Sequence, residues 1–356
     1  MKVAFVCPRY YPYIGGIEKR LKEVCERLVK KGFEIDVLTT DPSGKLRVEE
    51  VINGVRIKRF KALAPNESYY FSPALRRYLK RYAKNYEIID AHSYHALPAL
   101  YAAEAKYNNK LIFTPHFHGR GHTFIRNLLH IPYRLIARKI FEKADAIICH
   151  SKYEQELVKM TFGIEDNKFV LIPSGIDPQE FQGIEKPKVK RGKMILYVGR
   201  LEKYKGVEYL VRVLPKLNGE FFLTIIGTGP YKKNLVKLIK KLKLQDRVIL
   251  HESLPRSELI KKYAEADVFV ILSKYEAFCV SVAEALASKT PCIVANTSAL
   301  REWIDNENCF GISYPIDLNK LAKLIEEVAN IQVKNLELPT WDEVAEEIRK
   351  VYERLS

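Results

Sequence analysis

Short apolar runs of four to seven residues alternate with longer amphipathic segments along almost the whole chain. A buried parallel strand reads as a continuous apolar run and a covering helix as an apolar stripe, so this alternation predicts βαβ units and parallel sheets. The clearest predicted helix, residues 17–32, ends on basic residues and a glycine, as helix carboxyl ends commonly do. In the first half the predicted strands are KVAFVCP, EIDVLTT, VRIKRF, EIIDAH, LIFTPH, DAIICHS and FVLIPSG.

The alternation breaks at a polar, basic stretch with Gly and Pro, which predicts a linker over residues 183–192. A second series then begins with an apolar strand, a glycine-bearing loop with basic residues and a helix, as the first does. With 356 residues the chain can bury two cores. The sequence therefore predicts an α/β fold of two Rossmann-like, doubly wound parallel-sheet domains, 1–182 and 193–335, facing each other across a ligand-binding cleft. The strands predicted in the second half are MILYVG, FFLTIIGTG, RVILH, ADVFVILS and PCIVAN.

Composition is that of a globular protein, with 47% hydrophobic and 29% charged residues, so long disordered tracts are not expected. The longest apolar runs are strand-sized, far short of the roughly 20 residues that a membrane-spanning helix needs. The apolar stretch at the amino terminus is too short for a signal peptide and leads into a predicted helix. The six cysteines stand singly, without Cys-x-x-Cys spacing. We therefore expect a cytoplasmic protein without structural zinc or disulfides.

The chain has 59 Lys and Arg against 43 Asp and Glu, a net charge of +16. This charge favours an anionic partner, which could be a nucleic acid, an acidic lipid surface or a phosphorylated small molecule. Lys- and Glu-rich surfaces also occur in heat-stable proteins, so charge alone does not choose among these partners. No RNA-binding motif with interleaved aromatic residues is visible, so nucleic acid is not expected.

Two segments of the first half, 76–84 and 126–143, mix basic with aromatic or aliphatic residues in a helical rhythm. Helices of this kind bind anionic membrane surfaces, or they pack on a sheet as ordinary amphipathic helices. Together with the net charge, they lead to the hypothesis of a lipid-linked or membrane-proximal acceptor and a peripheral contact with the cytoplasmic face of a membrane.

Two glycine- or lysine-bearing loops could bind phosphate. In the first half, Gly15 and Gly16 directly precede a predicted helix, where backbone N–H groups and the helix dipole favour an anion. A tight turn is the alternative. In the second half, Arg200 and Lys205 occupy the equivalent loop, where two cations can hold a diphosphate and offset its charge as it departs. The alternative there is a solvated turn, and Gly227 in GTGP need only form a turn.

His116 ends the predicted strand LIFTPH, and His118 and His122 follow it. No carboxylate or cysteine accompanies them at ligand spacing, and no Asp-x-Asp motif occurs in the chain. We therefore expect no metal site. Hydrogen bonding to a polar substrate is favoured, and hydrogen bonding to the local backbone is the alternative.

Two glutamates bracket the start of a predicted helix over 281–287. Glu284 lies inside this helix among Ala and Val, and Glu276 precedes it. An ionised carboxylate removed from water is costly, so such a glutamate is wet, paired or used for binding. Backbone amides at 278–280 could face an anion. The alternative is a capping glutamate followed by an exposed helical one.

Taken together, these segments resemble the family-4 retaining glycosyltransferases (glycosyl transferases group 1), which have the GT-B fold. The resemblance covers nearly the whole chain, and its best-known signature is the Glu-x7-Glu spacing of Glu276 and Glu284. Its markers occur in the family's order, as GGIE, TPH, HSKYEQELV, LIPSGIDPQEF, VGRLEKYKG, IGTGP, ADVFVILSKYEAFCVSVAEALASKTPCIVAN and WDEVAEEIRKVYERL.

The resemblance implies a role for each matching residue in the second half. Arg200 and Lys205 would grip the donor diphosphate. Glu284 would bind the ribose, and Glu276 would meet the transferred sugar. The nucleobase would rest near Leu250 to Leu254. The implied donor-binding set also includes Gly15, Gly16, Gly227, Phe278, Cys279 and Val280.

In the first half, Gly16 would approach the phosphate. His116 would contact the sugar if TPH is aligned on Thr-x-His, and His118 would do so if the alignment rests on His-Gly; we prefer His116. The implied catalytic set is Glu276, His116, Arg200 and Lys205. The carboxyl-terminal helix, 341–356, would cross back to complete the first domain.

The implied reaction is metal-independent transfer of a hexose from a UDP- or GDP-sugar to a hydroxyl of a glycan, polysaccharide precursor or lipid-linked acceptor, with the anomeric configuration retained. A GT-B nucleotide-sugar epimerase and a non-catalytic nucleotide-sugar or anion-binding protein are the alternatives. The chain departs from the family pattern at Cys279, where the family has glycine, and at Ser174, where it has Asn. The sulfur at 279 would crowd an amide beside the donor.

Overall fold

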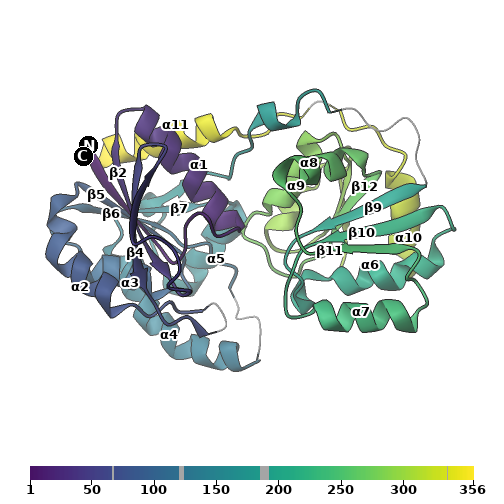
Figure 1. The fold of residues 1–356 in the computed structure, drawn as a ribbon, viewed down its shortest axis with the longest axis horizontal. Coiled ribbons are helices and arrows are strands. Elements are labelled where there is room, and N and C mark those ends of the chain that lie inside the picture. Colours follow the sequence, from purple (N-terminus) through teal and green to yellow (C-terminus); the bar gives the residue numbers. More distant parts are fainter. Residues whose placement is uncertain (66–67, 120–123, 185–191, 335) are drawn as a thin grey trace. The chain divides into compact units, whose positions relative to one another are not determined.

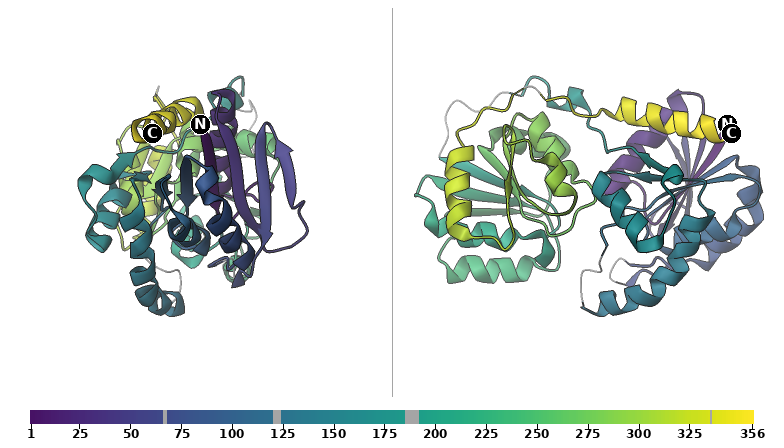
Figure 2. Two further views of the ribbon diagram at one scale, coloured as in Figure 1. Left: turned by 90° about the vertical axis from the view of Figure 1, so that its left-hand side faces the viewer. Right: turned by 180° about the vertical axis from the view of Figure 1, so that it is seen from behind.

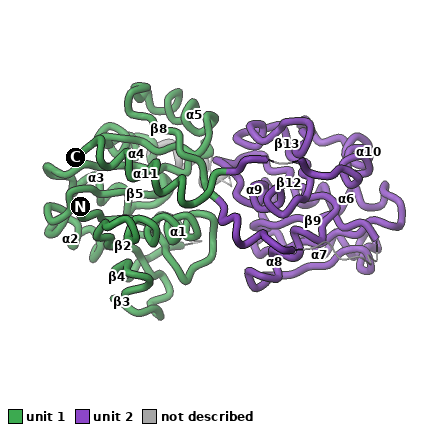
Figure 3. Tube along the Cα trace, turned by 90° about the horizontal axis from the view of Figure 1, so that it is seen from above, with its two compact units in different colours: residues 1–175, 339–356 green, residues 176–338 purple. Residues whose placement is uncertain are grey.

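The computed structural model describes residues 1–65, 68–119, 124–184, 192–334 and 336–356 (Figure 1). These residues form two compact units (Figure 3). Unit 1 consists of Met1–Gly175 and Pro339–Ser356, and unit 2 of Ile176–Leu338. No helix among the described residues is both long enough and apolar enough to cross a bilayer.

Unit 1 is built on an eight-stranded sheet with the order β3-β4-β2-β1-β5-β6-β7-β8. All neighbours are parallel except β3 and β4, which form an antiparallel hairpin. The strands are β1 (Lys2–Cys7), β2 (Glu34–Asp41), β3 (Glu49–Ile52), β4 (Val55–Lys61), β5 (Ile88–His92), β6 (Lys110–Thr114), β7 (Ala146–Cys149) and β8 (Phe169–Leu171).

Alternate residues of β1 face the two cores of unit 1, because successive strand side chains point to opposite faces of a sheet. Val3, Phe5 and Cys7 pack in one core with residues of α1 and α11, whereas Ala4 and Val6 pack in the other with residues of α2 to α5. Figure 2 shows helices on both faces of this sheet. They are α1 (Gly16–Lys30), α2 (Pro73–Tyr82), α3 (Leu97–Ala105), α4 (Phe124–Lys143), α5 (Lys152–Phe162) and α11 (Trp341–Leu355).

The carboxyl-terminal helix α11 lies beside α1 in unit 1 (Figure 1). It begins with a capping box, in which Thr340 accepts from the Glu343 amide and Glu343 accepts in return from the Thr340 amide. The fully buried Trp341 anchors its first turn. On the surface, Arg27 of α1 pairs with Asp342, at 3.1 Å between Nε and Oδ1.

Unit 2 contains a parallel six-stranded sheet with the order β11-β10-β9-β12-β13-β14 and one large apolar core. Its strands are β9 (Lys193–Val198), β10 (Phe221–Ile226), β11 (Val248–His251), β12 (Val268–Ile271), β13 (Cys292–Ala295) and β14 (Cys309–Ile312). Its helices are α6 (Val207–Val213), α7 (Lys232–Lys241), α8 (Arg256–Glu265), α9 (Val280–Ala287) and α10 (Leu318–Val328), with the short 3₁₀ turns η4 (Pro178–Phe181) and η5 (Lys203–Lys205) before α6.

The structure differs from the predicted organisation in three places. The sequence analysis did not identify β3 or β14. It also assigned residues 176–182 to the first domain, whereas the contacts place them in unit 2. Within this stretch, Glu180 forms an ion pair with Arg256 at the start of α8. Of the predicted linker, 183–192, the part at 185–191 lies outside the described residues.

Candidate functional site

The carboxyl ends of strands β9, β10 and β12 are held together by close backbone packing at glycines. A Cβ on Gly227, which has φ 152°, would collide with the carbonyl oxygen of Gly199. A Cβ on Gly206, with φ 71°, would collide with the carbonyl oxygen of Leu272. Only glycine allows such close approach. The structure thus gives Gly227 a role in loop packing, while its predicted contact with a donor remains a prediction.

Lys205 and Glu276 form the most enclosed ion pair in this region. Lys205 lies in η5 after β9, Glu276 lies after β12, and Nζ is 2.5 Å from Oε1. Burial alone would lower the pKa of Lys205, but the Glu276 carboxylate and two neighbouring tyrosines raise it well above its ordinary value. Lys205 is therefore charged at physiological pH. The ion pair also brings two of the predicted site residues, Lys205 and Glu276, into contact.

Arg200 belongs to the same loop as Lys205 but extends towards solvent, with 56% of its side chain exposed. Its Nη2 lies 3.3 Å from Oε1 of Glu202. An exposed guanidinium keeps its rotamer freedom and can bind an anion in bidentate fashion without breaking a buried contact. The loop thus offers one fixed cation, Lys205, and one exposed cation, Arg200.

The buried Glu284 of α9 is paired with a cation that sequence reasoning missed. Nη1 of Arg256 donates to Glu284 Oε1 at 2.7 Å, and the rest of its guanidinium binds Glu180 through Nε at 3.0 Å and Nη2 at 2.5 Å. Burial lowers the pKa of Arg256, but the two carboxylates raise it more. The alternative of an exposed helical glutamate is thereby excluded for Glu284.

The segment between the two glutamates turns sharply into α9. Cys279 is its N-cap, with φ 84°, a left-handed conformation that costs a non-glycine residue about 1 kcal/mol or more. Burial, and then the Glu276 carboxylate, raises the pKa of the Cys279 thiol to about 12. The Phe278 carbonyl accepts from Trp303 Nε1 at 2.8 Å, and Val280 begins the helix. Leu254, after β11, packs against the core of unit 2.

In unit 1, the glycine loop before α1 already holds a carboxylate. The side chain of Glu18 folds back over Gly15, so that a Cβ there would collide with Oε2, whereas a Cβ on Gly16 would meet open space. Glu18 is in turn paired with Arg9, at 2.9 Å between Oε1 and Nε. Of the two predicted phosphate-binding glycines, only Gly16 has an open approach in this conformation.

Of the three predicted histidines, His116 and His118 are described, and His122 lies outside the described residues. His116 has φ 51° and contacts two further histidines, His92 and His150, that the sequence analysis did not select. His118 stacks on His95, with ring centroids 5.0 Å apart. Within the part of the chain that the structure describes, no cluster of His, Cys, Asp and Glu has the form of a metal site.

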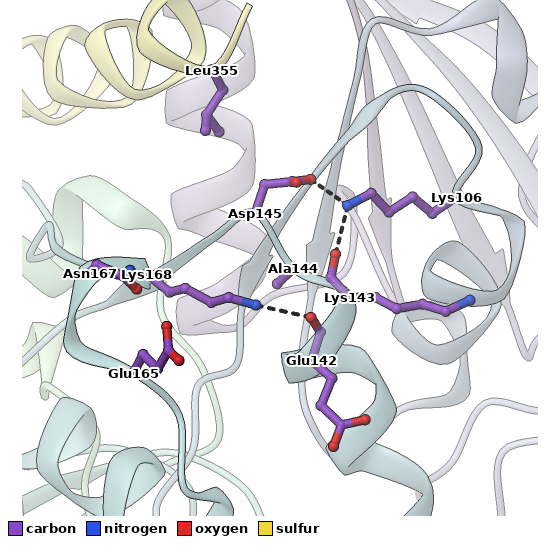
Figure 4. A pocket seen from close by; sticks show the side chains of 9 residues that line it. All are labelled: Lys106, Glu142, Lys143, Ala144, Asp145, Glu165, Asn167, Lys168 and Leu355. Atoms are coloured by element: carbon purple, nitrogen blue, oxygen red, sulfur yellow. Dashed lines mark hydrogen bonds and ion pairs between the residues drawn. The ribbon is translucent and has the colours of Figure 1, made fainter.

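A cavity of about 480 Å³ in unit 1 has a charged rim, and two of its lysines are engaged in hydrogen bonds (Figure 4). Lys106 Nζ donates to the Lys143 carbonyl at 2.8 Å and to Asp145 at 2.6 Å, and Lys168 Nζ donates to the Glu142 carbonyl at 2.9 Å. These lysines bind the last carbonyls of α4, as is common at helix carboxyl ends. The cavity therefore lies at the carboxyl end of α4, and none of the predicted site residues lines it.

Two family descriptions match the chain in succession. Residues 14–180 match Glycosyltransferase Family 4, and residues 179–351 match Glycosyl transferases group 1. An uncharacterized glycosyltransferase of Methanocaldococcus jannaschii is 27% identical over 99% of this chain and 98% of its own. Glycogen synthase of Mycobacterium tuberculosis is 25% identical over 92% of this chain and 86% of its own.

Solved structures have the same fold. Sucrose-phosphate synthase from Thermosynechococcus elongatus superposes with a TM-score of 0.79 at 20% identity, over 99% of this chain and 98% of its own. Anabaena HepE in complex with UDP and glucose gives 0.80 at 16% identity, over the full length of both chains. The predicted GT-B fold is confirmed, and the chain belongs to the glycosyl transferases group 1 and family-4 glycosyltransferases.

Proposed function

We propose that the protein is a retaining glycosyltransferase that moves a hexose from a UDP- or GDP-sugar to a hydroxyl of a glycan or lipid-linked acceptor. The observation that carries this proposal is the Lys205–Glu276 ion pair at the carboxyl ends of β9 and β12, with Arg200 exposed in the same loop. Ligands of open parallel sheets bind at this edge. The complexes of Anabaena HepE with UDP and with UDP-glucose support a uridine nucleotide as the first donor to test.

The chemistry follows from the charges. Arg200 and Lys205 would neutralise the negative charge that develops on the departing diphosphate in the transition state. The leaving phosphate would accept the proton of the attacking hydroxyl, on the face from which it leaves, so the anomeric configuration is kept. Glu276 would bind the transferred sugar, and Glu284 the ribose. These two cations would supply the positive charge for which other transferases use a metal ion.

The test is product analysis with a donor labelled in its sugar. We expect label in a new glycoside with the donor's anomeric configuration, read by proton NMR, and full activity in the presence of a chelator. Label recovered only as free or epimerised sugar would contradict transfer and favour an epimerase. Inversion at the anomeric carbon would contradict the retaining mechanism.

Arg256 provides a prediction specific to this chain. Arg256→Met removes the guanidinium that holds the Glu284 carboxylate, and charge-assisted hydrogen bonds of this kind contribute roughly 1.5–3 kcal/mol. We expect KM for the donor to rise about tenfold or more, with a smaller change in kcat, because the ribose contact is made in both ground and transition states.

Lys261→Met is the matched control, since Lys261 is an exposed residue of the same helix α8. Initial rates over a range of donor concentrations give KM and kcat for both variants. An Arg256→Met enzyme whose KM equals that of Lys261→Met would show that Arg256 does not support donor binding.

The two basic segments now differ in their suitability for membrane contact. The apolar residues of α2, Leu75 and Leu79, are buried in the core of unit 1, as in an ordinary amphipathic helix. In α4, by contrast, Leu135 is 73% exposed and Ile136 is 44% exposed, with Lys139 exposed nearby. We propose that α4 contacts the cytoplasmic face of an anionic membrane, where a lipid-linked acceptor would be found.

Co-sedimentation with anionic vesicles at low salt tests this contact. Leu135→Ser combined with Ile136→Ser should reduce binding about tenfold, because both side chains lose apolar area that would enter the interface. Met160→Ser is the control, since Met160 is 84% exposed on a different helix, α5. Failure of the wild-type protein to bind such vesicles would remove the membrane from the proposal.

A further inference from the structure

A chain of polar side chains runs through unit 1 from α11 towards His116. The Tyr352 hydroxyl donates to Asp90 Oδ2 at 2.6 Å. Asp90 Oδ1 lies 3.1 Å from His92 Nε2, within ion-pair distance but outside good hydrogen-bond alignment. His92 Nδ1 lies 3.5 Å from His116 Nε2. His92 is the last residue of β5 and His116 follows β6, and these two strands are neighbours in the sheet, so the sheet order brings the histidines together.

The chain continues from the other ring nitrogen of His116. Its Nδ1 lies 3.0 Å from His150 Nε2, and His150 Nδ1 lies 3.1 Å from the carbonyl oxygen of Ile172. His150 follows β7, the next strand of the sheet, and Ile172 follows β8. Three imidazoles therefore connect a carboxylate at one end to a backbone carbonyl at the other.

The contacts of this chain determine where its protons lie, because a neutral imidazole carries one N–H and one acceptor nitrogen. Three contacts, His92–His116, His116–His150 and His150–Ile172, have hydrogen-bond geometry, and each needs one proton. Asp90 Oδ1 and His92 Nε2 form no hydrogen bond with each other. Three neutral histidines thus supply one proton to each of the three contacts.

The Ile172 end decides the direction of these hydrogen bonds. The Ile172 carbonyl can only accept, so His150 carries its proton on Nδ1 and its Nε2 accepts. His116 must then carry its proton on Nδ1, and its Nε2 is an acceptor. That Nε2 receives the longest contact of the chain, 3.5 Å from His92 Nδ1, a long distance for a hydrogen bond.

We propose that His116 is held as the neutral Nδ1–H tautomer, and that its Nε2 is thereby presented as an acceptor for a ligand hydroxyl. His150, together with the Ile172 carbonyl, acts as a positioning residue, and Asp90 and Tyr352 position His92. The meaning for the reaction rests on the proposed function, in which His116 contacts a sugar hydroxyl. A phosphate or carbonyl oxygen would be repelled at this nitrogen.

The surroundings of His116 and His150 keep both imidazoles neutral. Burial, and then the neighbouring histidines, hold the pKa of His116 well below its ordinary value. Burial, and then the guanidinium of Arg20 from α1, do the same for the pKa of His150. The carboxylate that faces this region from α5, Glu154, accepts instead from the amides of Phe117 and His150, at 2.6 and 2.8 Å.

Long-range proton–nitrogen NMR of the unliganded protein, labelled with ¹⁵N-histidine, tests the proposal without an activity assay. At neutral pH we expect His116 to show a protonated Nδ1 and an unprotonated Nε2, with its signals assigned by their loss in His116→Gln. An Nε2–H tautomer, or an imidazolium, would overturn the proposal. Because no donor or acceptor is present, this outcome is independent of whether the protein transfers sugars.

Two variants separate positioning from general stability. His150→Phe keeps the ring shape but has no acceptor for His116 Nδ1–H, so the His116 nitrogen signals should shift towards the average of the two tautomers. Tyr352→Phe is the matched control: it removes one hydrogen bond at the Asp90 end and should leave the His116 tautomer unchanged. A single, unchanged tautomer in a folded His150→Phe protein would refute the role of His150.

Discussion

Lys205→Met is expected to slow sugar transfer by at least about 100-fold, the loss typical when one group that stabilises developing negative charge is removed. Lys205 is the enclosed cation of the β9 loop, and its distance of 2.5 Å from Glu276 fixes its position before any donor arrives. A cation that needs no reorganisation contributes most in the transition state. We therefore expect kcat to fall more than the affinity for the donor.

Initial rates with the nucleotide sugar that binds best measure this effect. Lys203→Met is the matched control, since Lys203 is an exposed residue of the same turn η5. Lys205→Arg should recover part of the rate because it keeps the charge. A Lys205→Met protein that is folded, as circular dichroism reports, and retains more than about a tenth of the rate would show that Lys205 has no part in the chemistry.

The second large effect concerns the pH dependence of stability. The fully buried Glu154 carboxyl holds the loop that contains His116, through the Phe117 amide. Burial raises its pKa to about 7 from an ordinary value of 4.5, although two backbone amides and Arg20 oppose the change. The folded protein thus keeps this proton to higher pH than the unfolded chain does. The contribution of Glu154 to stability is complete below about pH 4.5 and is lost as the pH rises to about 7.

Denaturant unfolding of the wild type and of Glu154→Gln across this range measures the contribution. The free energy of unfolding of the wild type, relative to the variant, should fall by roughly 3 kcal/mol between pH 4.5 and pH 7.5. Glu156→Gln, an exposed position of the same helix, should show a difference that does not depend on pH. A relative stability that rises with pH would mean that hydrogen bonding to the carboxylate outweighs its burial.

The pattern of apolar runs was sufficient to predict the two parallel sheets, because a strand buried on both faces reads as a continuous apolar run. It was insufficient for β3 and β14. The β3–β4 hairpin has a local signal outside that pattern, Asn53-Gly54, with φ values of 50° and 83° that suit a two-residue hairpin turn. In β14 the run is only four residues long and contains Gly311.

Candidate site residues could be selected where a motif specifies them, whereas contacts that only the fold creates could not be predicted. The Lys205–Glu276 pair joins two selected residues, but nothing in the sequence indicates that Arg256 reaches Glu284. Glu18 could have been found, since an acidic residue in the first turn of a helix commonly folds back on its amino terminus. His92 ends one predicted strand and His150 is the penultimate residue of another, yet their contact with His116 depends on the order β5-β6-β7, which cannot be read from the sequence.

Calorimetric titration with UDP, GDP and ADP tests the central claim, that the cations of the β9 loop hold a nucleoside diphosphate. We predict that at least one of these nucleotides binds the wild-type protein, that Lys205→Met combined with Arg200→Met weakens its binding at least about tenfold, and that Lys203→Met binds as the wild type does. Equal affinity in all three proteins would contradict the account.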